Sequence, residues 1–183
     1  KKKINYKSIK ANFVSQIFSS VSKNYDLMND IMSFGFHRLW KKELVELLDL
    51  SQKSLVLDLA AGSGDITKLI KKKNCDCIAY DENIDMLNVA KKKLANYQVH
   101  FVNGIAENLP FQNSSVDYVI ASFGIRNFSD METALVEINR VLKKKGRFLC
   151  LEFSEVNNPV LRKAVKLYYK VIPRYGKFFA NNK

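Results

Sequence analysis

From Leu55 onward, short apolar runs alternate with amphipathic segments of helix length. The apolar runs predict strands at 55–59, 77–80, 99–102, 116–121 and 148–153, and the amphipathic segments predict helices over 66–73, 84–94 and 132–142. Strands that alternate with helices in this way form a parallel sheet with crossover helices. We therefore predict an α/β fold with a central, mostly parallel sheet of about five strands.

The N-terminal region has a different pattern, because apolar side chains recur there at helical spacing with no strand-like runs. One stripe begins at Phe13, and the later stripes are separated by a break at Ser33–Phe34–Gly35–Phe36. Such stripes usually pack in a core, but these precede a self-sufficient sheet and could cover its ligand-binding edge as a lid. We divide the single structural domain into an N-terminal helical lid and substrate region (1–53), a cofactor-binding core (54–156) and a C-terminal helix and tail (157–183).

Three lysine runs, 71–73, 91–93 and 143–145, fall in or just after the last turn of a predicted helix. The helix dipole favours cations there, so solvated helix ends explain the runs better than phosphate sites do. Gly146 is expected to end the third helix in the left-handed conformation.

Composition narrows the functional classes. The chain has 183 residues, 47% hydrophobic and 26% charged, which is typical of a folded soluble domain. The formal charge of 30 − 18 = +12 favours nucleic acid, an anionic membrane surface or acidic partners. Three cysteines and two histidines offer little for a disulfide framework or a metal site, so we expect reduced thiols and no metal. No apolar run is long enough to span a membrane, which predicts a cytoplasmic protein.

A glycine turn after the first predicted strand marks the expected ligand site. The turn, Ala60–Ala61–Gly62–Ser63–Gly64–Asp65, leads into a helix, and ligands of such sheets bind at the carboxyl ends of the strands. A dinucleotide fingerprint would need glycine at position 67, and Asp65 would repel phosphate. Asp58 and Asp65 instead suit a cationic ligand without phosphate, such as S-adenosylmethionine.

Two later loops fit the same ligand. Asp81 ends the second strand, where a carboxylate can accept hydrogen bonds from both ribose hydroxyls. The loop from Gly104 to Phe111 follows the third strand and is expected to lie along the adenine. Any one of these acids could instead be a helix cap or a surface carboxylate, but their occurrence after successive strands favours the cofactor.

Several longer stretches carry a family resemblance. They are Tyr25–Gly35 (YDLMNDIMSFG), His37–Lys41 (HRLWK), Leu57–Ala60 (LDLA), Gly62–Asp65 (GSGD), Ser122–Asn127 (SFGIRN) and Leu151–Ser154 (LEFS). With them the sequence resembles the ubiquinone/menaquinone biosynthesis C-methyltransferases, class I S-adenosylmethionine-dependent enzymes with a Rossmann-like fold. The resemblance covers most of residues 17 to 176.

The resemblance implies cofactor contacts at Ser63, Asp81, Ile105, Ala106 and Ser122, beside Asp58, Gly62 and Gly64 of the glycine turn. Ile105 departs from the family pattern, where Asn or Asp is common, and offers the adenine amino group no side-chain acceptor. The family also continues for several tens of residues beyond the region where this chain stops, so we expect a less enclosed substrate site.

The implied reaction is C-methylation of a prenylated quinol ring. The family motifs would place Tyr25, Arg126 and Asn127 around the substrate as a catalytic polar cluster, with Arg126 orienting a water or stabilising a quinolate. A salt bridge from Arg126 to an acid such as Asp30 or Asp130 explains this residue about as well.

The partners follow from the substrate and the charge. We expect reversible, peripheral docking on an anionic inner membrane face, no nucleic acid, and a homodimer or association with other quinone-biosynthesis enzymes. An RNA or other small-molecule methyltransferase, and a non-catalytic S-adenosylmethionine-binding domain, remain alternatives. The choice between a benzoquinol and a naphthoquinol acceptor stays open.

Overall fold

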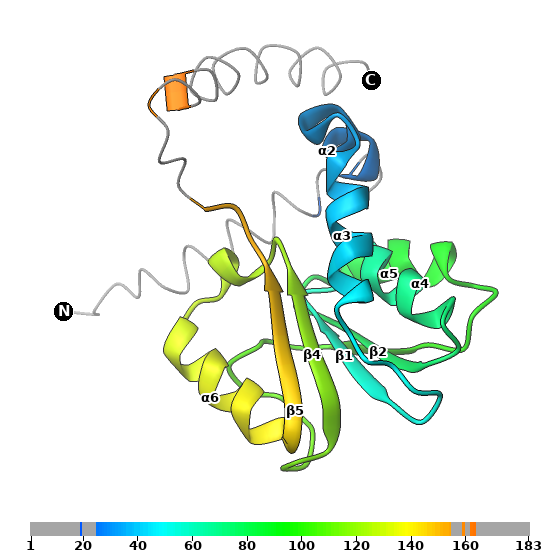
Figure 1. The fold of residues 1–183 in the computed structure, drawn as a ribbon, viewed down its shortest axis with the longest axis vertical. Helices are drawn as coiled ribbons and strands as arrows, with labels where there is room; N and C mark the ends of the chain where they lie inside the picture. Colours follow the sequence, from blue (N-terminus) through cyan, green and yellow to red (C-terminus); the bar gives the residue numbers. More distant parts are fainter. Residues whose placement is uncertain (1–18, 20–24, 155–158, 160–161, 164–183) are drawn as a thin grey trace.

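A computed structural model describes residues 19, 25–154, 159 and 162–163. Within these residues five parallel strands form one sheet in the order β3-β2-β1-β4-β5 (Figure 1). The strands are β1 (Leu55–Leu59), β2 (Asp76–Asp81), β3 (His100–Asn103), β4 (Val116–Ser122) and β5 (Leu142–Leu151). The predicted α/β fold with about five parallel strands is confirmed.

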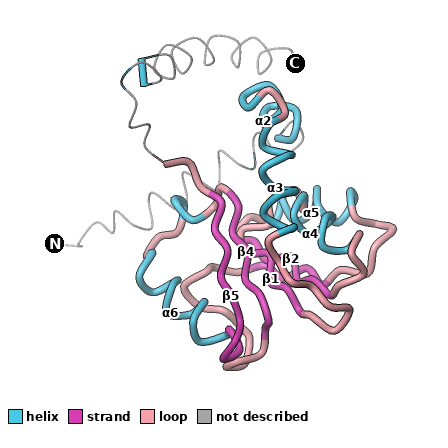
Figure 2. Tube along the Cα trace, in the orientation of Figure 1, coloured by secondary structure: helices cyan, strands magenta, loops and turns pink. Residues whose placement is uncertain are grey.

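The helices connect successive strands and cover both faces of the sheet (Figure 2). They are α4 (Asp65–Lys71), α5 (Ile84–Lys93), the short 3-10 helix η2 (Ile125–Asn127) and α6 (Met131–Val141). Two further helices, α2 (Tyr25–Ser33) and α3 (Phe36–Glu46), precede β1 and meet at Gly35, whose φ of 77° gives the left-handed turn between them. The predicted break at 33–36 is therefore confirmed, whereas the stripe that begins at Phe13 lies outside the described residues.

Each face of the sheet has its own apolar core. Val56 and Ile120 face α3 and α4, where they pack with Leu44, Val45 and Ile70. The alternate residues Leu57, Leu59 and Val119 face α6, where they pack with Ala134, Ile138 and Val141. Because both faces are covered, β1 is buried along nearly its whole length, as expected for the central strand of a parallel sheet.

The third lysine run lies in a strand. α6 ends at Val141, and Lys143, Lys144 and Lys145 belong to β5, where the pairing with β4 shifts register between Val116 and Tyr118. Gly146 does not adopt the predicted left-handed conformation, so this expectation was wrong. A Cβ at Gly146 would lie 2.9 Å from the Asp117 carbonyl oxygen, so close approach of the backbone explains the glycine.

Candidate cofactor site

A pocket opens at the carboxyl ends of β1, β2 and β4. The space that it surrounds, with its open mouth included, is about 630 Å³. The chain crosses from β1 to β2 in one direction and from β3 to β4 in the other, so the pocket lies where the strand order reverses. Ligands of open α/β sheets bind at that position. Of the residues predicted from the sequence, Gly62, Asp81, Ala106, Ser122 and Asn127 line the pocket.

The glycine loop is a tight turn with left-handed backbone. Ala60 (φ 58°), Gly62 (φ 56°) and Gly64 (φ 81°) all have positive φ. Gly64 also packs on α5, because a Cβ there would lie 2.8 Å from Leu94 Cδ1. The predicted loop is therefore held against α5, and its residues Ala60 and Gly62 line the pocket.

Of the three acids predicted from the sequence, Asp81 is the one that lines the pocket. One carboxylate oxygen accepts the amide N–H of Gly62 at 2.8 Å, and the other accepts that of Asn83 at 2.8 Å. Burial raises the pKa of Asp81, although these two hydrogen bonds favour the charged form. Since a carboxylate offers about four acceptor positions, Asp81 can still accept hydrogen bonds from a ribose.

The other two predicted acids do not line the pocket. Asp58 accepts the amide N–H of Thr67 at 2.9 Å and its hydroxyl at 2.5 Å, and burial raises the pKa of Asp58 to about 7 against these bonds. Asp65 forms ion pairs with Lys41 and Lys93. Burial opposes ionisation of Asp65, but the two lysines outweigh it and hold its pKa below the ordinary range. In this structure both acids hold the loop and the first turn of α4 in place.

The loop after β3 lies close to the end of β2. The Tyr80 hydroxyl donates to the Ile105 carbonyl oxygen at 2.9 Å, and Gly104 leaves room for it. Ala106 is buried and lines the pocket, whereas the Ile105 side chain is about half exposed and does not line it. Glu107 also lines the pocket and accepts the Asp130 amide N–H at 2.9 Å.

The SFGIRN stretch follows β4 and forms another wall. Ser122 lines the pocket, and its Oγ is buried with no hydrogen-bond partner among the described residues. Asn127 also lines the pocket, but Arg126 does not. The Arg126 guanidinium pairs with Glu152 and lies 5.2 Å from the centre of the Phe153 ring. The alternative that Arg126 forms a salt bridge thus holds in this structure, although with neither of the acids named from the sequence.

The remaining predicted residues lie beside the pocket on the α2 side. Ser63 is buried and donates to Asp26 at 2.5 Å. Tyr25 begins α2, but its side chain lies outside the described part of the chain, so its catalytic role stays a prediction.

Sequence reasoning missed several pocket residues. Glu82, Asn83 and Phe123 line the pocket together with Glu107. Asn83 also caps α5 by accepting the amide N–H groups of Asp85 and Met86. Position was the available signal for Glu82 and Asn83, because they follow Asp81 directly at the strand's carboxyl end.

Comparison with known proteins identifies the family. The model of the ubiE/COQ5 methyltransferase family matches residues 5–183. The chain belongs to this family.

Individual proteins agree with this assignment. The chain is 44% identical to the ubiquinone/menaquinone biosynthesis C-methyltransferase UbiE of Rickettsia bellii, over 97% of this chain and 77% of that protein. It is also 44% identical to the protein of the same name from Rickettsia prowazekii, over 100% of this chain and 77% of that protein. The crystal structure of the SAM-dependent methyltransferase TM1293 from Thermotoga maritima has the same fold, with a TM-score of 0.64 and 24% identity, over 86% of this chain and 70% of that one.

The residues of the pocket fit the cofactor that the family uses, S-adenosylmethionine. The left-handed glycine loop lets the ligand approach the backbone, Asp81 can accept from the ribose, and Ser122 Oγ is a buried group without a partner in the described residues. This protein is therefore a class I S-adenosylmethionine-dependent methyltransferase. Within the described part of the chain, no group of three or more His, Cys, Asp or Glu side chains could hold a metal ion.

Proposed function

We propose that this methyltransferase methylates a ring carbon of a prenylated quinol in ubiquinone or menaquinone biosynthesis. The observation that carries the proposal is the family match, which spans residues 5–183, joined to a pocket at the sheet edge where the SFGIRN stretch forms one wall. The relatives from Rickettsia are named for this reaction. An RNA methyltransferase would explain the net charge, but it would not explain this match.

The proposed cofactor contacts follow the geometry of the pocket. S-adenosylmethionine supplies a methyl group bonded to a positively charged sulfur. Asp81 accepts from the ribose, Gly62 and Ala106 approach the ligand closely, and Ser122 contributes a hydroxyl. Asp58, Gly64 and Ser63 act indirectly, because their contacts with Thr67, Leu94 and Asp26 fix the shape of the glycine loop.

The proposed catalytic group is Arg126, with Asn127 as its neighbour in the pocket wall. A hydroxylated ring is a good carbon nucleophile once a proton is removed, so a cation beside it favours the quinolate. Arg126 pairs with Glu152, and its side chain is about half exposed. We infer that Arg126 exchanges part of this ion pair for the quinol oxygen or for a water bound to it.

A direct assay tests the function. The full chain is incubated with S-adenosylmethionine carrying a labelled methyl group and with a demethylated benzoquinol or naphthoquinol that has a short prenyl chain. We expect label on a ring carbon of at least one acceptor. Calorimetric binding of the cofactor without transfer to either ring would support a non-catalytic domain, and transfer to RNA alone would support the rival activity.

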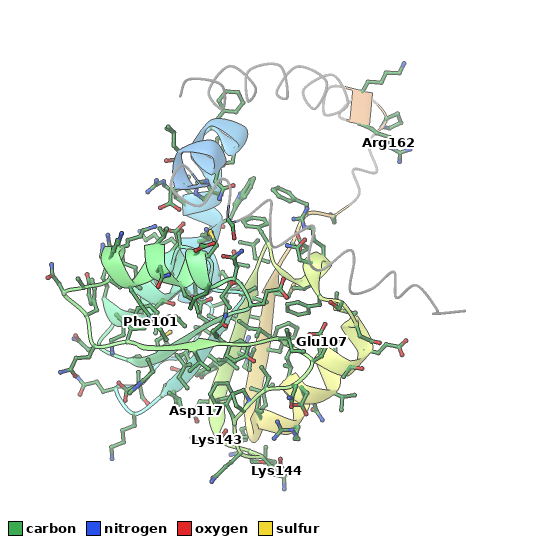
Figure 3. The ribbon with its side chains drawn as sticks, turned by 180° about the vertical axis from the view of Figure 1, so that it is seen from behind. Phe101, Glu107, Asp117, Lys143, Lys144 and Arg162 are labelled. Atoms are coloured by element: carbon green, nitrogen blue, oxygen red, sulfur yellow. The ribbon has the colours of Figure 1, made fainter. Side chains whose placement is uncertain are left out.

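We also propose that the enzyme docks on a membrane through apolar side chains near the lid. No helix of the described residues is long and apolar enough to cross a bilayer. Phe36 and Trp40 on α3 are exposed, and Trp40 packs edge-on against Phe153 at 6.2 Å between ring centres. Lys143 and Lys144 lie at the opposite end of the sheet from α2 (Figure 3). The expected cytoplasmic location, homodimer and association with other enzymes stay predictions.

Liposome sedimentation separates the apolar from the electrostatic contribution. Phe36→Ser should weaken binding about 10- to 100-fold, because an aromatic ring buried in the bilayer interface contributes about 1.5–3 kcal/mol. Lys144→Ser, a matched exposed control at the far end, should change binding by less than about twofold. A larger effect of the lysine would contradict docking through α3.

A further inference from the structure

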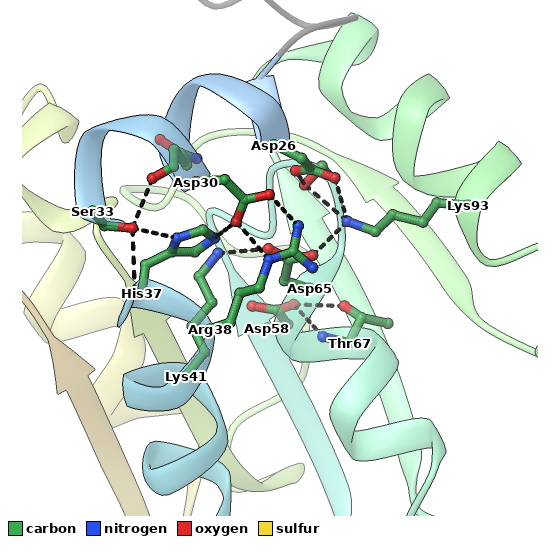
Figure 4. Close-up of polar contacts among 12 residues, drawn as sticks. Asp26, Asp30, Ser33, His37, Arg38, Lys41, Asp58, Asp65, Thr67 and Lys93 are labelled. Carbon is green, nitrogen blue, oxygen red and sulfur yellow. Dashed lines mark hydrogen bonds and ion pairs between the residues drawn. The ribbon is translucent and has the colours of Figure 1, made fainter. Parts of the chain in front are cut away.

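Among the described residues, four charged side chains from four helices meet beside the glycine loop (Figure 4). Lys93 of α5 donates to Asp26 of α2 at 2.6 Å and also pairs with Asp65 at the start of α4. Lys41 of α3 donates to the other oxygen of Asp65 at 2.8 Å. We call these four residues the ion-pair cluster. Ser63 of the glycine loop adds a hydrogen bond to the free oxygen of Asp26 at 2.5 Å.

The ion-pair cluster is largely shielded from solvent. The side chains of Lys41, Asp65 and Lys93 are 10%, 17% and 22% exposed. Shielded pairs are screened less by salt than surface pairs, and removing one member leaves a partly buried charge without its partner. Burial alone would lower the pKa of Lys93, but Asp65 and Asp26 outweigh it and raise that pKa. Lys93 and Asp65 are therefore both ionised near neutral pH.

Helices α2 and α3 are tied to one another as well. The Arg38 guanidinium donates two hydrogen bonds to Asp30, both at 2.6 Å, and Ser33 Oγ lies 2.7 Å from His37 Nδ1. Asp30 and Ser33 belong to α2, whereas His37 and Arg38 belong to α3. Loss of the contacts of Asp26 is therefore expected to change the positions of both α2 and α3.

We propose that Asp26 is a positioning residue that sets the substrate-side helices against the cofactor loop. Asp26 holds Ser63 of that loop and Lys93 of the core, and its neighbour in the chain is Tyr25, a predicted catalytic residue. Nothing in the sequence motif distinguishes Asp26 from a surface acid. The expected effect on turnover rests on the proposed function, because it needs the quinol acceptor. The role of Asp26 in placing α2 does not rest on it.

Asp26→Asn isolates the charge, because the amide oxygen can still accept from Ser63 while the attraction to Lys93 is weakened. Lys93→Met removes the other side of the pair, Lys93→Arg keeps it, and Lys92→Met is the matched control on an exposed neighbour. A misplacement of about 1 Å can cost about 100-fold in rate, so we expect kcat to fall about 10- to 100-fold in Asp26→Asn and Lys93→Met. Lys93→Arg and Lys92→Met should stay within about threefold of the wild type.

The cofactor affinity and the melting temperature distinguish positioning from general stability. The proposal requires a loss of kcat while the affinity for S-adenosylmethionine stays within about threefold and Lys93→Arg restores the rate. If Asp26→Asn behaves as Lys92→Met does, the proposal is overturned. It is also overturned if melting temperature, cofactor affinity and kcat all fall together.

Hydrogen exchange supplies a measurement that needs no acceptor. With S-adenosylhomocysteine bound, the amides of residues 28–33 in α2 should exchange at least about tenfold faster in Asp26→Asn than in the wild type. Equal exchange in the two proteins overturns the proposal. If the wild type methylates neither quinol but the exchange difference is found, the proposed function fails and the role of Asp26 in placing α2 stands.

Discussion

Replacement of Gly104 by alanine tests the packing that holds the cofactor loop. Tyr80 is 1% exposed, and its hydroxyl donates to the Ile105 carbonyl oxygen at 2.9 Å. Burial, together with the nearby Glu107 and Glu137 carboxylates, raises the pKa of Tyr80 to about 12, so the hydroxyl keeps its proton. A Cβ on Gly104 would lie 2.2 Å from that hydroxyl oxygen and 2.8 Å from Cζ. The tyrosine or the loop must therefore move.

The magnitude follows from the overlap. Overpacking of this kind costs about 1–3 kcal/mol of unfolding free energy. Tyr80→Phe alone costs about 0.5–1.5 kcal/mol, because it removes the buried hydrogen bond to Ile105. In the double variant the oxygen is gone and the nearest ring carbon is 2.8 Å away, so the clash is only partly relieved. The double variant should therefore be less destabilised than the sum of the single variants, by about 0.5–2 kcal/mol.

Urea unfolding of the wild type, the two single variants and the double variant measures these differences in unfolding free energy. The melting temperature of Gly104→Ala should fall by about 2–4 °C for each kcal/mol lost. Cofactor affinity should fall with it, since Gly104 and Ala106 line the pocket. Gly104→Ala within about 0.5 kcal/mol of the wild type, or strict additivity in the cycle, would refute the argument.

Three further predictions concern charge. Arg126→Ala should lower turnover at least about 100-fold while cofactor affinity by calorimetry stays within about threefold; unchanged turnover rejects the role. Because burial raises the pKa of Asp81, cofactor affinity should begin to decline at a higher pH than an ordinary carboxylate would give, and Asp81→Asn should bind the cofactor more weakly but with a flatter pH profile. The pKa of Asp65 is lower in the folded protein than in the unfolded chain. Ionised Asp65 therefore stabilises the fold above the ordinary pKa of a carboxyl group, and this stabilisation is lost as the pH falls through the pKa of the folded protein. Lys41→Met should lower the free energy of unfolding, measured in urea, by about 1–3 kcal/mol at neutral pH and by much less in acid.

Much of the fold was predictable because it depends on local patterns. The apolar run at Leu55–Leu59 coincides with β1, and the Ser33–Phe36 break coincides with the end of α2. The error at Gly146 arose because a glycine after a lysine run is a common helix end, whereas here the backbone of Asp117 approaches it. That approach depends on strand pairing, which no local pattern reports.

The site was predictable in position but less so in the role of each residue. Asp81 and Ser122 end their strands, and a parallel sheet brings such ends to one edge. Lys93 was expected to be a solvated helix end, yet it forms ion pairs with Asp26 and Asp65. The partners lie 67 and 28 residues away in the chain, so the contact arises only from the tertiary fold.

The acidic side chains of the pocket wall suit a cationic ligand, but they are not the two carboxylates, Asp58 and Asp65, on which the sequence argument rested. Asp58 is buried and accepts two hydrogen bonds from Thr67, and Asp65 pairs with two lysines, so neither carboxylate lines the pocket. The acids in the pocket wall are Asp81, Glu82 and Glu107. Burial raises the pKa of Glu82 as it does that of Asp81, so a bound cation also favours the ionised form of both groups. An acidic pocket wall of this kind favours a sulfonium over a phosphate, and the ion pairs of Asp65 tie the start of α4 to α3 and α5.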